Sequence, residues 1–439
     1  MNFTAALYYL LALGHETLAI KLGLKNTELL LAGLGNPERA YHSVQIAGTN
    51  GKGSTAVVLD SICRQAGIKT GLYTSPHLVS ITERIRFNGC AIGETEFGRL
   101  AGIVRTTAEE LLAKSKIEAL PTFFEQVTAI ALLAFREAKV DLAILETGLG
   151  GRLDSTTAAN AQVVAITQIA LDHEEYLGHT IASIAAEKAA IIKPGVHRVI
   201  VAPNQPPEAL AIIKKRCDEF DIIPIDACTR EIEDVSADGR FCVTFSTPTS
   251  TYERLWLGLR GKHQIDNVAV AIQLAESVKQ LGWADIPTPA ICAGVTEANN
   301  PGRLEIVSTS PTILLDGAHN PAGAKALREY LEAFAKRPLT LIFGAMRDKQ
   351  LETIAETLLP VADHVILSPV NSPRATPVAQ LQQIAERHLP PRQITISSCS
   401  SAALETAIAL TSAAGMICVA GSLYLIGEIR PQLVTVPRA

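Results

Sequence analysis

A short apolar run that ends in glycines, a lysine and hydroxyl residues constrains the fold of this chain more than any other stretch. Residues 43–55 read SVQIAGTNGKGST, and the apolar side chains of residues 57–63 then share one helical stripe. This order predicts a strand, a tight loop and a helix. Glycines allow the backbone to approach a phosphate closely, and the helix N-terminus supplies free N–H groups and a positive dipole. We therefore predict a phosphate-binding loop.

The spacing within this loop differs from the ordinary phosphate-loop pattern. Gly48 to Gly51 is two residues short, and Gly53 separates Lys52 from the hydroxyl residues that follow. Lys52 is still placed to lie along the β- and γ-phosphates, and Ser54 could offer its hydroxyl group to a metal or a phosphate oxygen. A plain turn between a strand and a helix is the alternative interpretation of the same residues.

The rest of the chain continues the alternation of strands and helices. Its 439 residues suffice for two or three domains, and 48% are apolar with only 5% aromatic, as in α/β proteins with buried parallel sheets. Further strands are predicted at residues 69–74, 141–146, 163–167, 312–315, 339–343, 364–367, 393–397 and 416–420. Helices are predicted at residues 3–31, with an interruption at residues 21–24, and at residues 122–138 and 180–192.

Two stretches depart from this rhythm. Residues 229–256 alternate as a small antiparallel excursion would, and residues 299–303, Asn-Asn-Pro-Gly-Arg, have the composition of a linker. We therefore expect an α/β protein with an N-terminal doubly wound P-loop domain over residues 1–298. A smaller, Rossmann-like α/β domain is expected over residues 299–439.

Composition excludes several classes of function. The net charge of −5 provides no basic field for a nucleic acid, although small anionic substrates need only local positive charge. The eight cysteines contain no C-x-x-C pair and are typical of reduced thiols in a cytosolic protein. No lysine or arginine precedes Lys21, so the N-terminus is a poor signal peptide. Residues 406–427 are uncharged and long enough for a membrane span, but internal glycines divide them into a helix, a strand and a new helix.

Polar residues at the ends of the predicted strands carry the candidate chemistry. Ligands of doubly wound sheets bind beyond the carboxyl ends of the strands, where Thr49, Ser75, Glu146, His173 and Asp316 fall. A glutamate at such a position can hold Mg²⁺ beside a phosphate loop. Taken singly, each of these residues also has a structural explanation, such as a helix cap, a salt bridge or a structural histidine.

An ordered set of motifs resembles the folylpolyglutamate synthase and dihydrofolate synthase family, a branch of the Mur-type ATP-dependent peptide ligases. The motifs are GTNGKGS at 48–54, TSPHL at 74–78, LETGLGGRLD at 145–154, LDH at 171–173 with LG at 177–178, EKA at 187–189, HQ at 263–264 with Asn267, PGR at 301–303, DGAHNP at 316–321, DK at 348–349 and GSL at 421–423. Thr157 stands where the family commonly has asparagine, and Gln350 where an acidic residue is frequent. Neither departure removes a metal or phosphate contact.

The resemblance implies a role for each matching residue. The ATP phosphates would be held by Thr49, Asn50, Gly51, Lys52, Gly53 and Ser54, and further ATP contacts would come from Asn267, Arg303 and Asp316. Ser75 and Glu146 would bind one Mg²⁺ ion and His173 a second, with Lys188 as a metal ligand after carbamylation. The pterin would lie against Thr122, Phe123, Phe124, Glu125, Leu153, Asp154 and Ser155, and the loop around Lys21 and Leu22 would contribute. His319 would lie near the nucleotide and the glutamate, and catalysis would involve Lys52, Lys188, Asp316 and His319.

The implied reaction is an ATP-dependent ligation in two steps. A carboxylate of dihydropteroate or of a folate attacks the γ-phosphate and forms an acyl phosphate, and the amine of L-glutamate then displaces phosphate. Lys52 and two metal ions would offset negative charge, and closure at the linker near residue 300 would exclude water. The resemblance thus implies a monomeric, cytoplasmic ligase of folate biosynthesis and one-carbon metabolism. Its N-terminal ATPase domain would also bind the pterin, and its C-terminal domain the glutamate.

Three alternatives were weighed against this interpretation. A Mur-type ligase acting on a nucleotide sugar would usually carry a further N-terminal domain, for which a phosphate loop starting at residue 48 leaves no room. A non-enzymatic nucleotide-binding module would need the phosphate loop but neither the second metal set nor residues 316–321. Within the family, the enzyme either makes both dihydrofolate and folylpolyglutamates or only lengthens folates. The intact Phe-Phe-Glu stretch at residues 123–125 and the compact chain favour both activities.

Overall fold

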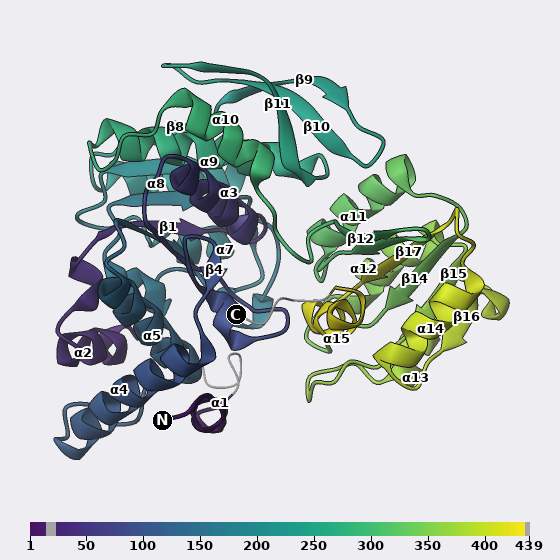
Figure 1. Cartoon of the computed structure of the whole chain (residues 1–439), viewed down its shortest axis with the longest axis horizontal. Coiled ribbons are helices and arrows are strands. Elements are labelled where there is room, and N and C mark those ends of the chain that lie inside the picture. The colour runs from purple at the N-terminus through teal and green to yellow at the C-terminus, as the bar shows by residue number, and fades with distance from the viewer. Residues whose placement is uncertain (15–22, 435–439) are drawn as a thin grey trace.

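The aliphatic runs of the sequence form the buried strands of two large sheets. The computed structural model describes residues 1–14 and 23–434. An eight-stranded and a three-stranded sheet are built from residues before 261, and a six-stranded sheet from residues after 304. Figure 1 shows the two large sheets in separate α/β units, each with helices packed around it. The predicted pair of doubly wound α/β domains is therefore confirmed.

The eight-stranded sheet has the order β4-β3-β2-β5-β1-β6-β7-β8. Its central strand β1 (His42–Ala47) runs parallel to both neighbours, β5 (Leu142–Glu146) and β6 (Val163–Ile166). The outer strands are β2 (Thr70–Tyr73), β3 (Ile85–Phe87), β4 (Cys90–Ala91), β7 (Arg198–Val201) and β8 (Ile225–Asp226). Strand β3 pairs antiparallel with both of its neighbours, β2 and β4, and the other pairs of this sheet are parallel. The residues that follow β1, β2, β5 and β6 consequently meet at one edge of the sheet.

Helices cover both faces of this sheet because its central strands are apolar on both sides. One face packs against α3 (Lys52–Gln65), α9 (His263–Gln280) and α10 (Thr288–Glu297), with Val44 and Ile46 in the core between them. The helices of the other face are α1 (Phe3–Ala12), α2 (Lys25–Gly33), α4 (Glu94–Ala113), α5 (Phe123–Ala138), α7 (Ile181–Ala189) and α8 (Pro207–Asp218). The short helix α6 (Glu174–Leu177) follows β6.

The predicted antiparallel excursion is a three-stranded sheet. Its strands are β9 (Thr229–Val235), β10 (Arg240–Ser246) and β11 (Thr251–Arg260), in the order β11-β10-β9. The inward residues of this sheet join the core that contains α9. The sheet lies at the top of Figure 1.

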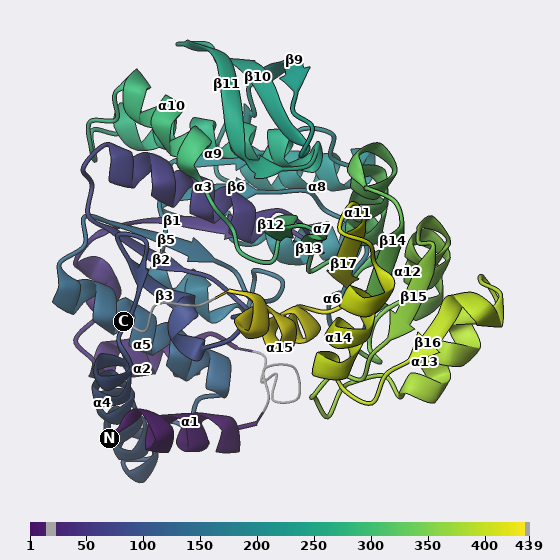
Figure 2. The same cartoon turned by 45° about the vertical axis from the view of Figure 1, so that its right-hand side comes forward.

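The six-stranded sheet has the order β12-β13-β17-β14-β15-β16 and is parallel except for β12. Its strands are β12 (Glu305–Thr309), β13 (Thr312–Leu315), β14 (Leu339–Phe343), β15 (His364–Leu367), β16 (Ile394–Ile396) and β17 (Met416–Ala420). The helices around it are α11 (Pro321–Phe334), α12 (Leu351–Leu358), α13 (Val378–Ala385), α14 (Ser400–Leu410) and α15 (Leu423–Leu433). In Figures 1 and 2, α15 lies on the side of this sheet that faces the N-terminal domain.

One predicted helix differs in the structure. The helix expected over residues 3–31, with an interruption at residues 21–24, begins as α1, which ends before Gly14 with its φ of +101°, and α2 starts directly after the expected interruption, at Lys25. Lys21 and Leu22, predicted to contribute to pterin binding, lie outside the described residues. The uncharged stretch at residues 406–427 is divided into α14, β17 and α15, as predicted. Across the described residues, every helix is too short or too polar to cross a membrane.

Candidate active site

The phosphate loop joins β1 to α3 at the carboxyl edge of the eight-stranded sheet. Gly51 has a φ of +89°, and a Cβ atom at this position would lie 2.1 Å from Oδ1 of Asn267. A Cβ atom on Gly53 would lie 3.2 Å from Oε2 of Glu146. Both close approaches favour glycine, and they bring the first turn of α3 against Asn267 on one side and Glu146 on the other.

Two lysine amines converge on the carbonyl oxygen of Gly48. Lys52 Nζ donates a hydrogen bond of 3.0 Å to this oxygen, and Lys188 Nζ donates one of 2.7 Å. Lys52 also donates to the carbonyl oxygen of Thr49, at 3.2 Å. Removal from water lowers the pKa of the Lys52 amine, and burial and the charge of Lys52 together lower the pKa of Lys188 to about 7. An anionic ligand here would meet both amines.

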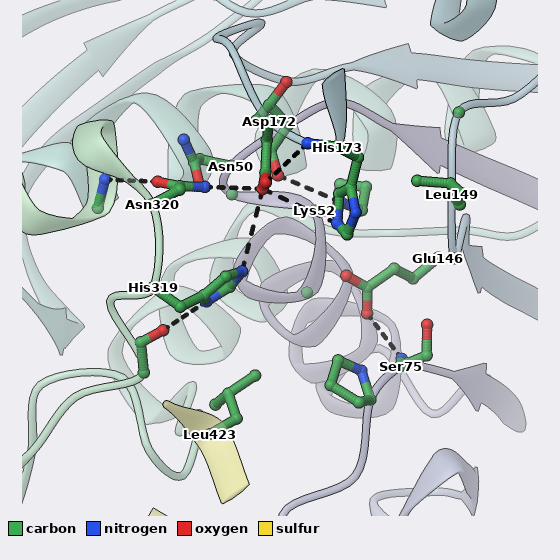
Figure 3. Close-up of a pocket in the computed structure, with 18 of the residues that line it drawn as sticks. Asn50, Lys52, Ser75, Glu146, Leu149, Asp172, His173, His319, Asn320 and Leu423 are labelled. Carbon is green, nitrogen blue, oxygen red and sulfur yellow. Dashed lines mark hydrogen bonds and ion pairs between the residues drawn. The ribbon is translucent and has the colours of Figure 1, made fainter. Parts of the chain in front are cut away.

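Ser75 and Glu146 face each other at the ends of β2 and β5 (Figure 3). The backbone N–H of Ser75 donates to Oε2 of Glu146 at 3.1 Å. Burial raises the pKa of Glu146, and the charge of Lys52 opposes this rise. A carboxylate and a hydroxyl group are hard oxygen donors, which Mg²⁺ prefers.

The side chains of Glu146, Ser75 and His173 suit a metal ion that takes its remaining ligands from a substrate. Among the described residues, no group of three or more His, Cys, Asp and Glu side chains could enclose a metal ion. Mg²⁺ is commonly held by one or two carboxylates together with substrate phosphates and water. Glu146, Ser75 and His173 border the same cavity as the phosphate loop, so they suit this mode of binding.

The segment before His173 is bonded to the phosphate loop. The backbone N–H groups of Thr49 and Asn50 donate to the carbonyl oxygen of Gln168, at 2.9 and 3.2 Å. The Thr49 hydroxyl donates to the carbonyl oxygen of Ala170 and accepts from its N–H, both at 3.0 Å. The hydroxyl of Thr49 is therefore engaged in fixing the loop that carries His173. Burial lowers the pKa of His173 to about 3.

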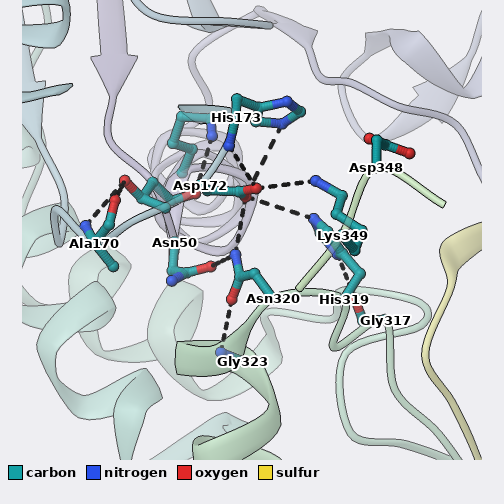
Figure 4. A network of polar contacts seen from close by, with 12 residues as sticks. Asn50, Ala170, Asp172, His173, Gly317, His319, Asn320, Gly323, Asp348 and Lys349 are labelled. Carbon is teal, nitrogen blue, oxygen red and sulfur yellow. Dashed lines mark hydrogen bonds and ion pairs between the residues drawn. The ribbon is translucent and has the colours of Figure 1, made fainter. Parts of the chain in front are cut away.

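The carboxylate of Asp172 interacts with side chains of the C-terminal domain (Figure 4). Its carboxylate receives a hydrogen bond of 3.0 Å from Nδ2 of Asn320 and an ion pair of 2.9 Å from Nζ of Lys349. Nε2 of His319 lies 4.0 Å away. Burial alone would raise the pKa of Asp172, but His173, Lys349 and His319 hold it well below its usual range. This carboxylate thus joins the two domains at the cavity.

Asp316 organises the first loop of the C-terminal domain. Its carboxylate accepts the N–H of Leu304 at 2.9 Å and that of Ala318 at 3.0 Å. Arg303 donates to the carbonyl oxygen of Gly317 at 3.2 Å. Burial raises the pKa of Asp316, and the charge of Arg303 opposes this rise. Asp316 therefore fixes the backbone beside Arg303, and its contact with a nucleotide stays a prediction.

The residues predicted to hold a pterin have unequal access to the cavity. Phe124 lines it, whereas Phe123 is 4% exposed and packs in the core, with the Arg84 guanidinium carbon 5.5 Å from its ring centroid. Neighbouring residues of a helix point about 100° apart. The two rings consequently point in different directions, and only Phe124 offers its face to a ligand.

Three other polar residues of this set are engaged with the backbone. Thr122 and Glu125 form a capping box at the start of α5. Asp154 accepts the N–H groups of Gly148 and Leu149, at 2.8 and 2.9 Å. These side chains shape the wall of the cavity, and their contact with a pterin stays a prediction.

One cavity of about 400 Å³ connects these features between the two domains, within the range of small-molecule sites. Among the described residues that were predicted for the site, all except Phe123 line this cavity. They are Thr49, Asn50, Gly51, Lys52, Gly53, Ser54, Ser75, Thr122, Phe124, Glu125, Glu146, Leu153, Asp154, Ser155, His173, Lys188, Asn267, Arg303, Asp316 and His319. Five further residues line the cavity without having been predicted as site residues, namely Asp172, Asn320, Lys349, Arg374 and His263. All of these except Arg374 stand within the quoted motifs.

Two families of Mur ligase domains match the chain. The Mur ligase middle domain matches residues 46–275, and the glutamate ligase domain of Mur ligases matches residues 302–423. The dihydrofolate synthase/folylpolyglutamate synthase of Bacillus subtilis is 35% identical over 429 residues, which are 96% of this chain and 97% of that protein.

Solved structures agree over nearly the whole chain. A Mycobacterium tuberculosis folylpolyglutamate synthase complexed with ADP and AMPPCP has a TM-score of 0.87 and 31% identity, covering 99% of this chain and 100% of that one. Escherichia coli FolC in complex with DHPP and ADP has a TM-score of 0.86 and 30% identity, covering 98% and 97%.

Proposed function

Because the chain belongs to the dihydrofolate synthase/folylpolyglutamate synthase family of Mur-type ligases, we propose that it joins L-glutamate to dihydropteroate and to folates with consumption of ATP. One observation carries the proposal: a single cavity holds the phosphate loop of one domain and residues 316–320 of the other. A reaction of three substrates needs such a shared space, because the acid, the nucleotide and the amine must meet.

The proposed chemistry has two steps. A carboxylate oxygen of the pteroate substrate attacks the γ-phosphorus of ATP, and the bond to the bridging oxygen breaks to release ADP. The amine of L-glutamate then attacks the acyl carbon, phosphate leaves, and the amine gives up a proton. Lys52, which lines the cavity, would offset charge on the transferring phosphoryl group. Asn320 and Asp172 line the same cavity and are hydrogen-bonded to each other across the two domains.

Two magnesium ions complete the proposed site. Ser75 and Glu146 would hold one ion, and His173 together with a carbamylated Lys188 would hold the other. When bound, the ions supply positive charge to the phosphate oxygens. Glu146, which lies beside the first turn of α3 and accepts the N–H of Ser75, supports the first of these positions.

We expect Lys188 to take up CO₂. Lys188 is 4% exposed, and its amine lies close to the cation of Lys52, which disfavours a second charge. Nζ would attack the carbon of CO₂, an N–C bond would form, and a proton would leave to give a carbamate. Protein equilibrated with ¹³C-labelled bicarbonate should show one carbamate resonance by NMR. This resonance should vanish in Lys188→Gln and persist in Lys193→Gln, which removes a partly buried amine that donates to Thr157 and Asn160. A spectrum without the resonance would contradict carbamylation.

On the substrate side, we propose that the pterin lies against Phe124, between Leu153 and Ser155. Phe124 supplies a ring face for stacking on a flat heterocycle, and a methyl group on Gly148 would meet this ring at 2.4 Å. The close contact with Gly148 supports a fixed position of the ring.

Assays of the purified protein test the function. We expect ADP release only when L-glutamate and either dihydropteroate or tetrahydrofolate are both present, with labelled glutamate entering each product. If labelled glutamate is incorporated with tetrahydrofolate but not with dihydropteroate, the protein has only the narrower activity, which is the elongation of folates. ATP turnover that ignores both co-substrates would contradict the proposal.

The proposal also includes the domain boundary, the cellular location and the oligomeric state of the protein. We place the domain boundary between residues 298 and 299, because the last helix of the first domain ends at Glu297 and the strands of the last sheet begin at Glu305. We also propose that the protein is cytoplasmic, where its nucleotide and folate substrates are available. A monomer is expected from the resemblance to the family.

A further inference from the structure

Helix α15 contains a glycine that its backbone conformation does not explain. Gly427 stands in the middle of this helix, and its φ is not in the left-handed region. Glycine is destabilising in a helix interior relative to alanine. A Cβ atom on Gly427 would lie 2.0 Å from the carbonyl oxygen of Leu78 and 3.0 Å from its carbonyl carbon. The glycine is therefore needed for close approach of another backbone segment.

That segment belongs to the N-terminal domain. The side chain of Leu78 packs into the core of the C-terminal domain that contains Ile426 and Leu423. A Cβ atom on Gly302, in the linker, would lie 3.1 Å from Leu78 Cδ1 and 3.6 Å from Ile426 Cγ2. Leu78 is thus enclosed by α15 and the linker, and its carbonyl lies on Gly427.

The segment of residues 75–80 is tied down at both ends. The Glu83 carboxylate accepts the N–H groups of Leu78, Val79 and Ser80, at 2.9, 3.1 and 2.9 Å. At the other end, the Ser75 N–H donates to Glu146. A displacement of Leu78 must consequently be taken up by these hydrogen bonds.

We propose that Leu78 and Gly427 form an interdomain seat through which the C-terminal domain positions Ser75 and Glu146. The Leu423 end of α15 lines the active-site cavity, and Gly427 lies one turn further along the same helix. The helix thus connects the cavity wall to the segment that carries Ser75. Ser75 and Glu146 as metal ligands rest on the proposed function, whereas the seat is a matter of packing alone.

Hydrogen exchange in the absence of ligands tests the seat independently of catalysis. In Gly427→Ala the methyl group pushes Leu78 away, so we expect the amides of residues 78–80 to exchange about fivefold faster or more. Leu78→Ala should do the same without added bulk. The matched control is Gly93→Ala, where φ is −68° and nothing lies within 4 Å of the added methyl group. If the amides of residues 78–80 exchange at the wild-type rate in both Gly427→Ala and Leu78→Ala, the proposal is overturned.

Kinetics then test the positioning role. We expect Gly427→Ala and Leu78→Ala to lower kcat at least tenfold and to raise the Mg²⁺ concentration for half-maximal rate, while Gly93→Ala changes neither. Faster exchange with an unchanged kcat and Mg²⁺ requirement would overturn the positioning role. A wild-type protein that ligates no glutamate would refute the proposed function, and the exchange comparison would still decide whether the seat exists.

Discussion

Replacing Lys52 by methionine lowers kcat/KM for ATP by about 10³-fold, the effect expected for loss of a positioned cation at a reacting phosphate. Lys52 is the phosphate-loop lysine that lines the cavity, and its amine already lies against the loop carbonyls of Gly48 and Thr49. Arginine should not rescue the activity, because its planar guanidinium cannot replace a compact ammonium group inside this loop. Steady-state ADP release with saturating glutamate and folate measures the effect.

The control for this substitution is Lys114→Met, which replaces an exposed lysine directly after the end of α4 that pairs with Glu110 on the surface. It should retain wild-type kcat/KM. ADP binding and thermal unfolding of Lys52→Met should show that the loop still folds. Activity of Lys52→Met within tenfold of wild type would contradict the role assigned to this lysine.

We expect replacement of Asp172 by alanine to lower kcat/KM by about 10²-fold or more and to destabilise the contact between the domains. The substitution leaves Lys349, 8% exposed, without its carboxylate partner, and an unpaired buried charge costs about 3–5 kcal/mol. Asp172→Asn keeps an acceptor for Asn320 but loses the charge that faces Lys349. We therefore expect this variant to be intermediate.

A double-mutant cycle separates this ion pair from other effects of Asp172. Thermal and denaturant unfolding of Asp172→Ala, Lys349→Met and the double variant should give a coupling energy of at least about 1 kcal/mol. The matched surface pair is Arg337 and Asp363, which are 52% and 50% exposed, and about 0–1 kcal/mol is expected there. Additive effects at Asp172 and Lys349 would show that their contact does not hold the domains together.

The ends of the strands that carry the site were predictable from sequence, because buried strands and the loops after them have strong local patterns, whereas the short strands β3, β4 and β12 were not predicted. Lys52, Glu146, His173 and Asp316 follow such strands, and the cavity brings all four together. In contrast, the pairing of Asp172 with Lys349 joins residues 177 positions apart in the chain. No local pattern contains that information, because it depends on how two separately folded sheets are placed.

Side-chain direction was the second limit on prediction from sequence. Phe123 and Phe124 are equivalent in a motif, but successive helix residues face different ways, so Phe123 entered the core. The carboxylates of Asp154 and Glu125 are occupied by backbone N–H groups of their own loops. A motif records that a carboxylate is present but not whether its oxygens are free for a ligand.

The two lysine amines that meet at the Gly48 carbonyl oxygen affect the stability of the folded protein. Folding removes both amines from water and holds them close together, so the folded protein disfavours a second ammonium charge, and the pKa of Lys188 falls to about 7. The cost of this desolvation is present whether or not a nucleotide is bound. A less stable folded protein and an amine at Lys188 that can react with CO₂ are therefore two expected results of the same pair of lysines.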